Sequence, residues 1–227
     1  MSLAGKRIIV TGAAGVLGAA VVHAALAQGA SVAAVGHAKA PVFEGERVHA
    51  LAGGDLADTD AAEAAVSGAV HALGALNGVV NAAGGFRFAK LAGGNLDAFD
   101  LLYRMNLRSA AAVSRAALAH LREGGRIVNV GSASALKAGA GVAAYTASKA
   151  GVLRLTESLA DELKGRGINV NAVLPSIIDT PQNRRDMPDA DFAQWAKPEA
   201  LASVIVFLLS DAASAVTGAL IPVVGRV

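Results

Sequence analysis

Short runs of β-branched residues alternate along this chain with longer alanine-rich stretches whose apolar residues repeat at helical spacing. We predict that the runs are buried strands and the stretches are helices, because a strand covered on both faces has a nearly continuous apolar sequence. Such alternation is typical of βαβ units, whose right-handed crossovers make the strands parallel and place helices on both faces of the sheet. The chain is therefore predicted to be an α/β protein with a doubly wound parallel sheet.

The predicted elements follow one another without an internal repeat or a linker. Strands are expected over residues 7–11, 31–35, 47–51, 76–81, 126–130, 168–174 and 219–224. Helices are expected over residues 16–28, 58–73, 96–121, 142–164 and 198–209. A length of 227 residues fits one domain, 1–227, in which the irregular segment 176–197 is predicted to be a lid over a pocket.

The composition narrows the possible functions. A net charge of +2, with no run of more than two Lys or Arg residues, argues against a nucleic-acid partner. Cysteine is absent and the five histidines lack ligand spacing, so no metal site is expected. The sequence has no apolar run of 18 residues and no signal-peptide pattern, so we expect a cytoplasmic protein without a membrane partner.

Tyr145 and Lys149 are one helical turn apart within the helix predicted over residues 142–164, so their side chains share a face. A lysine ammonium there is expected to lower the pKa of the tyrosine from its ordinary value of about 10. A phenol with a lowered pKa can exchange a proton near neutral pH. Ser132 lies 13 residues upstream of the tyrosine, and its hydroxyl can hold a carbonyl oxygen. The simpler alternative is a partly buried aromatic residue and a solvated lysine.

A glycine-rich loop connects the first predicted strand to the first predicted helix. Gly12, Gly15 and Gly18 follow one another at intervals of three residues within residues 11–18. Glycines at this place let the backbone approach a pyrophosphate, whose charge faces the amino end of the helix. A plain strand-to-helix turn is the alternative, and the regular spacing favours the phosphate site.

With these motifs, the chain resembles the short-chain dehydrogenase/reductase family along its whole length, which implies a single-domain Rossmann-type fold. Ser132, Tyr145 and Lys149 match the family's catalytic trio in order and spacing, and Asn106 falls at its catalytic asparagine. Further matches are the asparagine motif Asn81-Ala82-Ala83-Gly84, the adenine-site pair Asp55-Leu56, Pro175 and Thr180. The chain departs from the usual pattern at Gly15, one residue early, and at Ser176, where a glycine is usual.

The resemblance implies a nicotinamide cofactor. Its expected binding residues are Gly12, Ala14, Gly15, Val16, Leu17, Gly18, Gly36, His37, Asp55, Leu56, Asn81, Ala82, Ala83, Gly84, Tyr145, Lys149, Pro175, Ile178 and Thr180. Gly36 replaces the aspartate with which NAD-preferring members bind the ribose, so NADP(H) is favoured over NAD(H). His37 or Lys39 would then contact the 2′-phosphate.

The resemblance also implies hydride transfer between the nicotinamide and a carbonyl or secondary alcohol. Tyr145 would be the general acid or base, and Lys149 would lower its pKa and bind the nicotinamide ribose. Ser132 would polarise the substrate oxygen, and the substrate is expected to contact Ser132, Tyr145 and Trp195. Asn106 would hold a water that relays protons to Lys149, unless it only binds a backbone group. Family members commonly pair their two long helices, so a homodimer or homotetramer is expected.

Three functions remain open. The first is an oxidoreductase acting on a small-molecule ketone or alcohol, such as a 3-oxoacyl thioester. The second is a pteridine reductase-like enzyme, because the glycine spacing and residues 174–195 are similar to dihydropteridine reductases. Those enzymes typically lack the catalytic serine that this chain keeps as Ser132. The third is an inactive dinucleotide-binding sensor or scaffold, which the intact trio of Ser132, Tyr145 and Lys149 disfavours.

Overall fold

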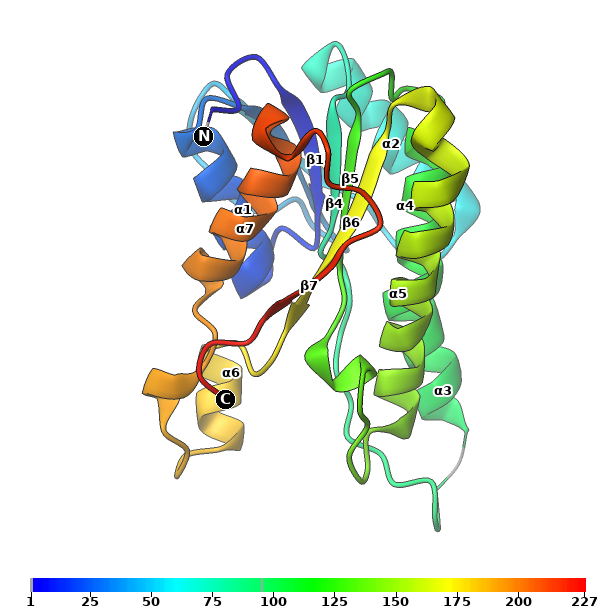
Figure 1. Cartoon of the computed structure of the whole chain (residues 1–227), viewed down its shortest axis with the longest axis vertical. Coiled ribbons are helices and arrows are strands. Elements are labelled where there is room, and N and C mark those ends of the chain that lie inside the picture. Colours follow the sequence, from blue (N-terminus) through cyan, green and yellow to red (C-terminus); the bar gives the residue numbers. More distant parts are fainter. Residues whose placement is uncertain (1, 95) are drawn as a thin grey trace.

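The computed structural model describes residues 2–94 and 96–227, which form a parallel sheet between two layers of helices (Figure 1). The strands are β1 (Arg7–Thr11), β2 (Ser31–Gly36), β3 (Val48–Ala52), β4 (Gly78–Asn81), β5 (Arg126–Val130), β6 (Asn169–Pro175) and β7 (Leu220–Val223). Their order across the sheet is β3-β2-β1-β4-β5-β6-β7, and every neighbouring pair is parallel. The predicted α/β fold is confirmed, and its direction of winding reverses between β1 and β4.

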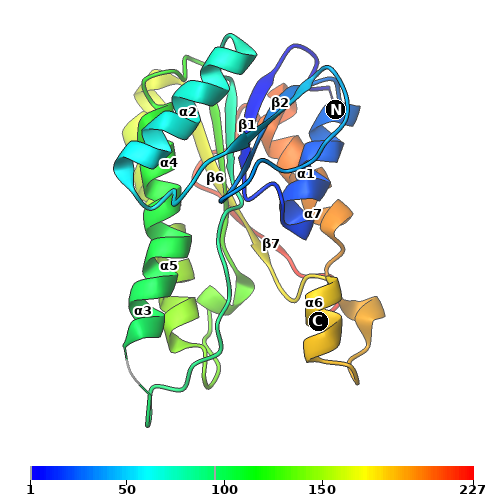
Figure 2. The ribbon, with the colours of Figure 1, turned by 180° about the vertical axis from the view of Figure 1, so that it is seen from behind.

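The helices cover both faces of this sheet, as Figure 2 shows from behind. One face carries α1 (Val16–Ala27) and α7 (Pro198–Leu209), and the other carries α2 (Thr59–Leu73), α4 (Ser109–Ala117) and α5 (Ala143–Leu163). A short helix, α3 (Asp97–Leu102), continues through a π-helical turn at Tyr103–Arg108 into α4. The lid contains α6 (Pro181–Asp186). No helix in the described ranges is long and apolar enough to cross a membrane.

The apolar core has one layer on each face of the sheet. In β1, Ile8 and Val10 belong to the layer under α1 and α7, whereas Ile9 belongs to the layer under α2, α4 and α5. Both layers consist of small and branched aliphatic residues, as expected for a chain that is 54% hydrophobic and only 4% aromatic. Burial of the inner strands on both faces explains why their sequences have no polar alternation.

The observed elements agree with the predicted ones within two residues, with two exceptions. The helix predicted over residues 96–121 contains the π-helical turn and ends at Ala117. The lid, predicted to be irregular over residues 176–197, contains α6. Thr180 starts that helix because its Oγ1 accepts a hydrogen bond from the Asn183 amide at 3.1 Å, and Pro181 occupies the first turn.

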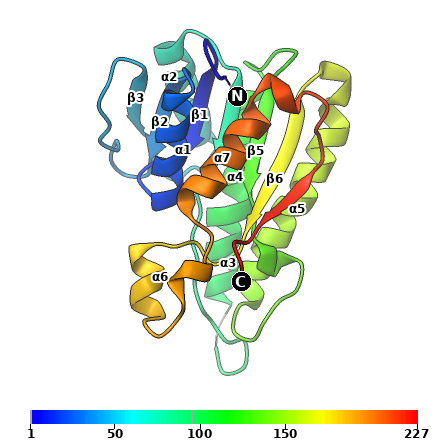
Figure 3. The same cartoon turned by 60° about the vertical axis from the view of Figure 1, so that its left-hand side comes forward.

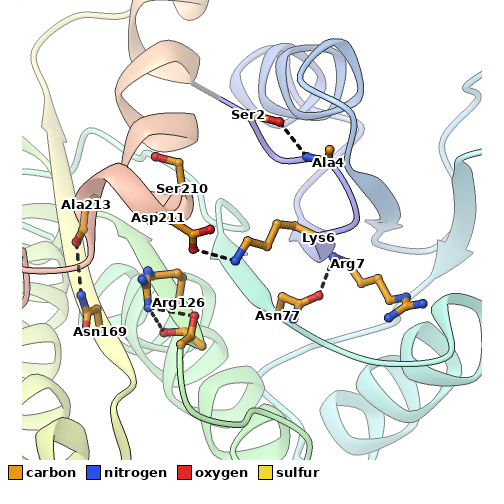
Figure 4. A network of polar contacts seen from close by, with 12 residues as sticks. Ser2, Ala4, Lys6, Arg7, Asn77, Arg126, Asn169, Ser210, Asp211 and Ala213 are labelled. Carbon is orange, nitrogen blue, oxygen red and sulfur yellow. Dashed lines mark hydrogen bonds and ion pairs between the residues drawn. The ribbon is translucent and has the colours of Figure 1, made fainter.

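Polar contacts fasten the amino ends of the strands, at the end of the molecule away from the lid (Figure 4). Lys6, just before β1, donates to Asp211 Oδ1 at 2.7 Å. The buried Arg126 begins β5, and its Nη1 donates to the Gly124 and Gly125 carbonyls at 2.8 and 3.0 Å. These contacts lie at the amino ends of the strands, so they do not occupy the carboxyl ends, where a ligand can bind.

Residues after β7 support the lid. Ser176 Oγ donates to the Val224 carbonyl at 2.6 Å, and the Arg226 amide donates to the Gln194 carbonyl at 2.8 Å. Gly225 has a φ of +66°, and a Cβ there would lie 2.5 Å from the Gln194 carbonyl oxygen. Figure 3 shows this end of the chain lying beside the part of the lid that follows α6. The lid and the segment after β7 therefore form one packed unit.

The glycine loop packs against the first turn of α1 and against the loop after β4. Gly12 has a φ of +65°, and a Cβ there would lie 2.7 Å from the Ala82 carbonyl oxygen. A Cβ on Gly18 would lie only 2.2 Å from the Gly12 carbonyl oxygen, whereas one on Gly15 would lie 3.3 Å from the same atom. Gly12 and Gly18 are thus required by close backbone contacts, and Gly15 is not.

We predict that Gly18→Ala lowers the free energy of unfolding by about 1–3 kcal/mol, because the added methyl group displaces packed backbone. This sign is opposite to the gain that an alanine normally brings inside a helix. Gly15→Ala, the matched control, should change the same quantity by less than about 1 kcal/mol. Urea unfolding with equal m-values would measure both effects, and a Gly18→Ala protein as stable as the wild type would contradict the packing argument.

Candidate active site

A cleft of about 1570 Å³ crosses the carboxyl ends of the strands. Its position at the point where the winding of the sheet reverses is where open α/β sheets bind ligands. Most of the residues predicted for a cofactor or substrate line it, namely Gly12, Ala14, Gly15, Val16, Leu17, Gly18, Gly36, His37, Asp55, Leu56, Ala82, Ala83, Gly84, Ser132, Tyr145, Lys149, Pro175, Ile178 and Thr180. Its volume can hold an elongated ligand together with a second, smaller one.

The hydroxyls of Tyr145 and Ser132 meet in this cleft and share a hydrogen bond. Ser132 follows β5 and caps the 3₁₀ turn Ala133–Ala135, since its Oγ accepts a hydrogen bond from the Ser134 amide at 3.3 Å. The Oγ atoms of Ser132 and Ser134 are 2.8 Å apart. The end of β5 and the first turn of α5 thus bring together two groups that can both contact one substrate oxygen.

Burial raises the pKa of Tyr145 above its ordinary value, and the hydrogen bond with Ser132 offsets part of that increase. The expectation that Lys149 lowers the pKa of Tyr145 is therefore wrong for this structure. Removing the phenolate from water costs more free energy than the neighbouring hydrogen bond returns. Tyr145 is consequently held as a neutral phenol, the form that can donate a proton.

Lys149 lies fully inside the protein, one turn after Tyr145 in α5, with 6% of the residue exposed. Its Nζ donates to the carbonyl of Val130, the last residue of β5, at 2.8 Å. Burial lowers the pKa of this lysine from the ordinary value of 10.5 to about 8. The same burial thus stabilises the neutral forms of both the phenol and the amine.

Asn106 is buried in the π-helical turn and does not line the cleft. Its Oδ1 accepts a hydrogen bond from the Gly85 amide at 2.8 Å. Its Nδ2 donates to the Gly85 carbonyl at 3.1 Å and to Ser148 Oγ at 2.9 Å. Ser148 Oγ in turn donates to the Tyr145 carbonyl at 2.7 Å. The Asn106 side chain therefore binds backbone and Ser148 in this structure, and the water relay to Lys149 stays a prediction.

Asn81 and Trp195, which were predicted to contact the cofactor and the substrate, do not line the cleft. The Asn81 side chain is buried and donates to Ser114 Oγ at 2.9 Å and to Asn129 Oδ1 at 2.8 Å, so it joins β4 to α4 and β5. Trp195 is 4% exposed, and its ring packs against Phe192 with 4.8 Å between the ring centres. Both side chains are used to hold the fold together.

Two exposed phenylalanines that the sequence analysis did not identify line the cleft in the loop after β4. The ring of Phe86 meets the ring of Tyr145 edge to face, with 5.0 Å between the ring centres. Phe88 packs on the loop before α5, where a Cβ on Gly141 would lie 2.2 Å from its ring. In a chain with only six phenylalanines, two in one predicted loop are the signal that would have marked an apolar binding surface.

The glycine-loop end of the cleft fits a dinucleotide. Gly15 caps α1 without a side-chain hydrogen bond, so the amides of the first turn are free to face an anion. His37 and Asp55 line the cleft nearby, and Asp55 Oδ2 pairs with Arg104 Nη2 at 2.7 Å. The hydrogen bond from Arg104 is the largest cause that lowers the pKa of Asp55. Arg104 is a third residue of the cleft that the sequence analysis did not identify.

Comparisons with known proteins agree with this geometry. The family model for short chain dehydrogenases matches residues 6–191. The chain is 31% identical to 2-(S)-hydroxypropyl-CoM dehydrogenase 3 of Xanthobacter autotrophicus, over 98% of this chain and 96% of that protein. It is 33% identical to the 3-oxoacyl-[acyl-carrier-protein] reductase FabG of Thermotoga maritima, over 99% and 98%. A short chain dehydrogenase from Burkholderia cenocepacia in complex with NADP has a TM-score of 0.85 at 32% identity, over 99% of this chain and 98% of that one.

We predict a pH-dependent effect on stability when Lys149 is replaced by Met. Because the folded protein holds the lysine pKa near 8, below the unfolded value of 10.5, the unfolded chain binds more protons between these pH values. Wild-type stability attributable to this group therefore rises with pH across that window. The free energy of unfolding of Lys149→Met, relative to wild type, should fall by about 3 kcal/mol from pH 7 to pH 11.

Urea unfolding at pH 7, 9 and 11 would measure this difference. Lys137→Met is the matched control because Lys137 is exposed, and the difference in unfolding free energy between this variant and wild type should stay nearly constant. A pH-independent difference for Lys149→Met would contradict the assigned burial of the amine.

Proposed function

The chain belongs to the short-chain dehydrogenase family, and from this premise we propose that Tyr145 serves as the general acid or base of its reaction. The enzyme is an oxidoreductase of the class that acts on CH–OH or C=O groups. The observation that carries the proposal is the presence of Ser132, Tyr145 and Lys149 in the cleft that also contains the glycine loop. When bound, a nicotinamide would supply or accept the hydride.

The proposed roles follow from the contacts of each side chain. Burial keeps the Tyr145 phenol protonated, which suits proton donation to a carbonyl oxygen during reduction. Ser132 would hold the same oxygen through the hydroxyl that now shares a hydrogen bond with Tyr145. Lys149 would bind the ribose of the nicotinamide from its buried position behind the phenol. Asn106 would act as a positioning residue, because its hydrogen bonds to Gly85 and Ser148 hold the loop after β4 against α5.

We also propose a preference for NADP(H). Gly36 leaves no carboxylate at the end of β2, and His37 lines the cleft next to it. Asp55, the neighbouring acid of that wall, has its charge paired with Arg104. Gly36 and His37 carry no carboxylate, and the carboxylate of Asp55 is paired, so these three residues would not repel a 2′-phosphate bound at this end of the cleft. The Burkholderia cenocepacia relative binds NADP, as its structure is described, which supports the same choice.

Tyr145→Phe should lower kcat by about 10²–10⁴-fold, the usual contribution of a general acid or base. The dissociation constant for NADPH should stay within about twofold of the wild-type value, because only the hydroxyl is removed. Tyr103→Phe, at an exposed position that does not line the cleft, is the matched control. Near-normal turnover by Tyr145→Phe would refute the role given to the phenol.

For the cofactor, we expect kcat/KM to be at least about tenfold higher with NADPH than with NADH, since a charged contact to the phosphate contributes on that scale. His37→Asp should reduce or reverse this ratio, because a carboxylate at that position would repel the 2′-phosphate. Steady-state kinetics with both cofactors would measure it. A clear NADH preference in the wild-type protein would overturn the proposal.

The substrate can be sought by following the absorbance of the reduced cofactor with a panel of carbonyl compounds. The panel should contain acetoacetyl thioesters, quinonoid dihydropterin and simple ketones, with sugar alcohols for the reverse direction. Selective reduction of the pterin would favour the pteridine reductase-like alternative. Tight NADPH binding without turnover of any compound would favour the inactive sensor or scaffold.

A further inference from the structure

Two adjacent arginines of the lid helix have different surroundings. Arg184 donates through Nε and Nη2 to the two carboxylate oxygens of Asp179, at 2.6 and 2.8 Å. Its guanidinium also lies 4.8 Å from the centre of the Phe192 ring. Lys197 Nζ binds the same carboxylate at 2.5 Å, and the Asp179 side chain is only 8% exposed. Arg184 is thus occupied in joining α6 to the rest of the lid.

Arg185, the next residue, lines the cleft together with Gln182, Asp186 and Met187. Its Nη2 donates to Gln182 Oε1 at 2.8 Å, and Gln182 Nε2 donates to Asp186 Oδ1 at 2.7 Å. No carboxylate in the described part of the chain forms an ion pair with Arg185. A guanidinium has five N–H donors, so Gln182 orients the group and leaves most of its donors for a ligand.

The other cationic side chains of the cleft are already engaged. Arg104 is paired with Asp55, and Lys149 is buried and bound to the Val130 carbonyl. Arg185 is exposed and lines the cleft, and no carboxylate among the described residues of the cleft wall forms an ion pair with it. Planar guanidinium groups bind carboxylate, sulfonate and phosphate oxygens in two-point contacts that an uncharged ligand group cannot replace.

We propose that Arg185 binds an oxyanion of a ligand in the cleft and so selects substrates that carry a carboxylate, sulfonate or phosphate beside the reacting carbon–oxygen group. This inference rests on the proposed function. Met187 from the lid and Phe86 and Phe88 from the loop after β4 supply apolar side chains to the same cleft. The pyrophosphate of the cofactor offers the same chemistry, and the test distinguishes the two sources.

The test compares Arg185→Met with Arg184→Met, which removes the same charge one residue away. Arg185→Lys retains the charge but loses the two-point contact. The probes are 4-acetylbenzoate and its methyl ester, a charged and a neutral ketone with one skeleton. Their affinities for the NADP-loaded protein would be measured by calorimetry, the affinity for NADPH by fluorescence titration, and kcat/KM wherever turnover occurs.

We expect Arg185→Met to weaken 4-acetylbenzoate binding about tenfold, with little change for the ester or for NADPH. Arg185→Lys should lose less, and Arg184→Met should affect both ketones alike because it loosens the lid. A tenfold loss of NADPH affinity in Arg185→Met, with an unchanged ratio between the ketones, would assign the oxyanion to the cofactor.

The proposal is overturned if Arg185→Met matches the wild type both in NADPH affinity and in the ratio between the two ketones. The binding measurements need no turnover. A wild-type protein that binds these ligands but reduces neither ketone would therefore count against the proposed hydride transfer and not against Arg185.

Discussion

The cleft depends on the hydrogen bonds of one buried amide. Asn106 binds the amide and carbonyl of Gly85 and the Ser148 hydroxyl. These hydrogen bonds hold the loop after β4 next to α5, the helix that contains Tyr145. Replacing Asn106 with an apolar residue would remove the side-chain partner of the part-buried amide and carbonyl of Gly85, and with it the link between that loop and Ser148. Its location in a π-helical turn is consistent with the frequent occurrence of such turns at functional sites.

Much of this architecture can be predicted because its determinants are local. The inner strands are buried on both faces, so their apolar runs have clear limits, and the parallel order follows from the alternation with helices. Parallel strands also place their carboxyl ends together. For that reason the glycine loop after β1, Ser132 after β5 and the first turns of α5 meet at one edge, although 121 positions separate Thr11 from Ser132.

The features that were missed depend on the environment in the folded chain. Trp195 was expected to contact the substrate as part of an apolar lid, but its ring is buried against Phe192 within the lid. The pKa of Tyr145 depends on how completely the phenol is desolvated, which spacing in the sequence does not report. The helix α6 was missed for a similar reason. Its Thr180 cap and Pro181 are local signals, but so short a helix is stable only when tertiary contacts hold it.

The support that the lid receives from residues 224–226 has a consequence for changing what this enzyme accepts. Ser176 and Gln194 lie at opposite ends of the lid, and both are hydrogen-bonded to that segment. Directed-evolution libraries restricted to the lid would therefore change the lid while leaving residues 224–226, which bind it, unchanged. Randomising both stretches together would allow compensating changes, and Gly225 is the position where such a library should tolerate the least diversity.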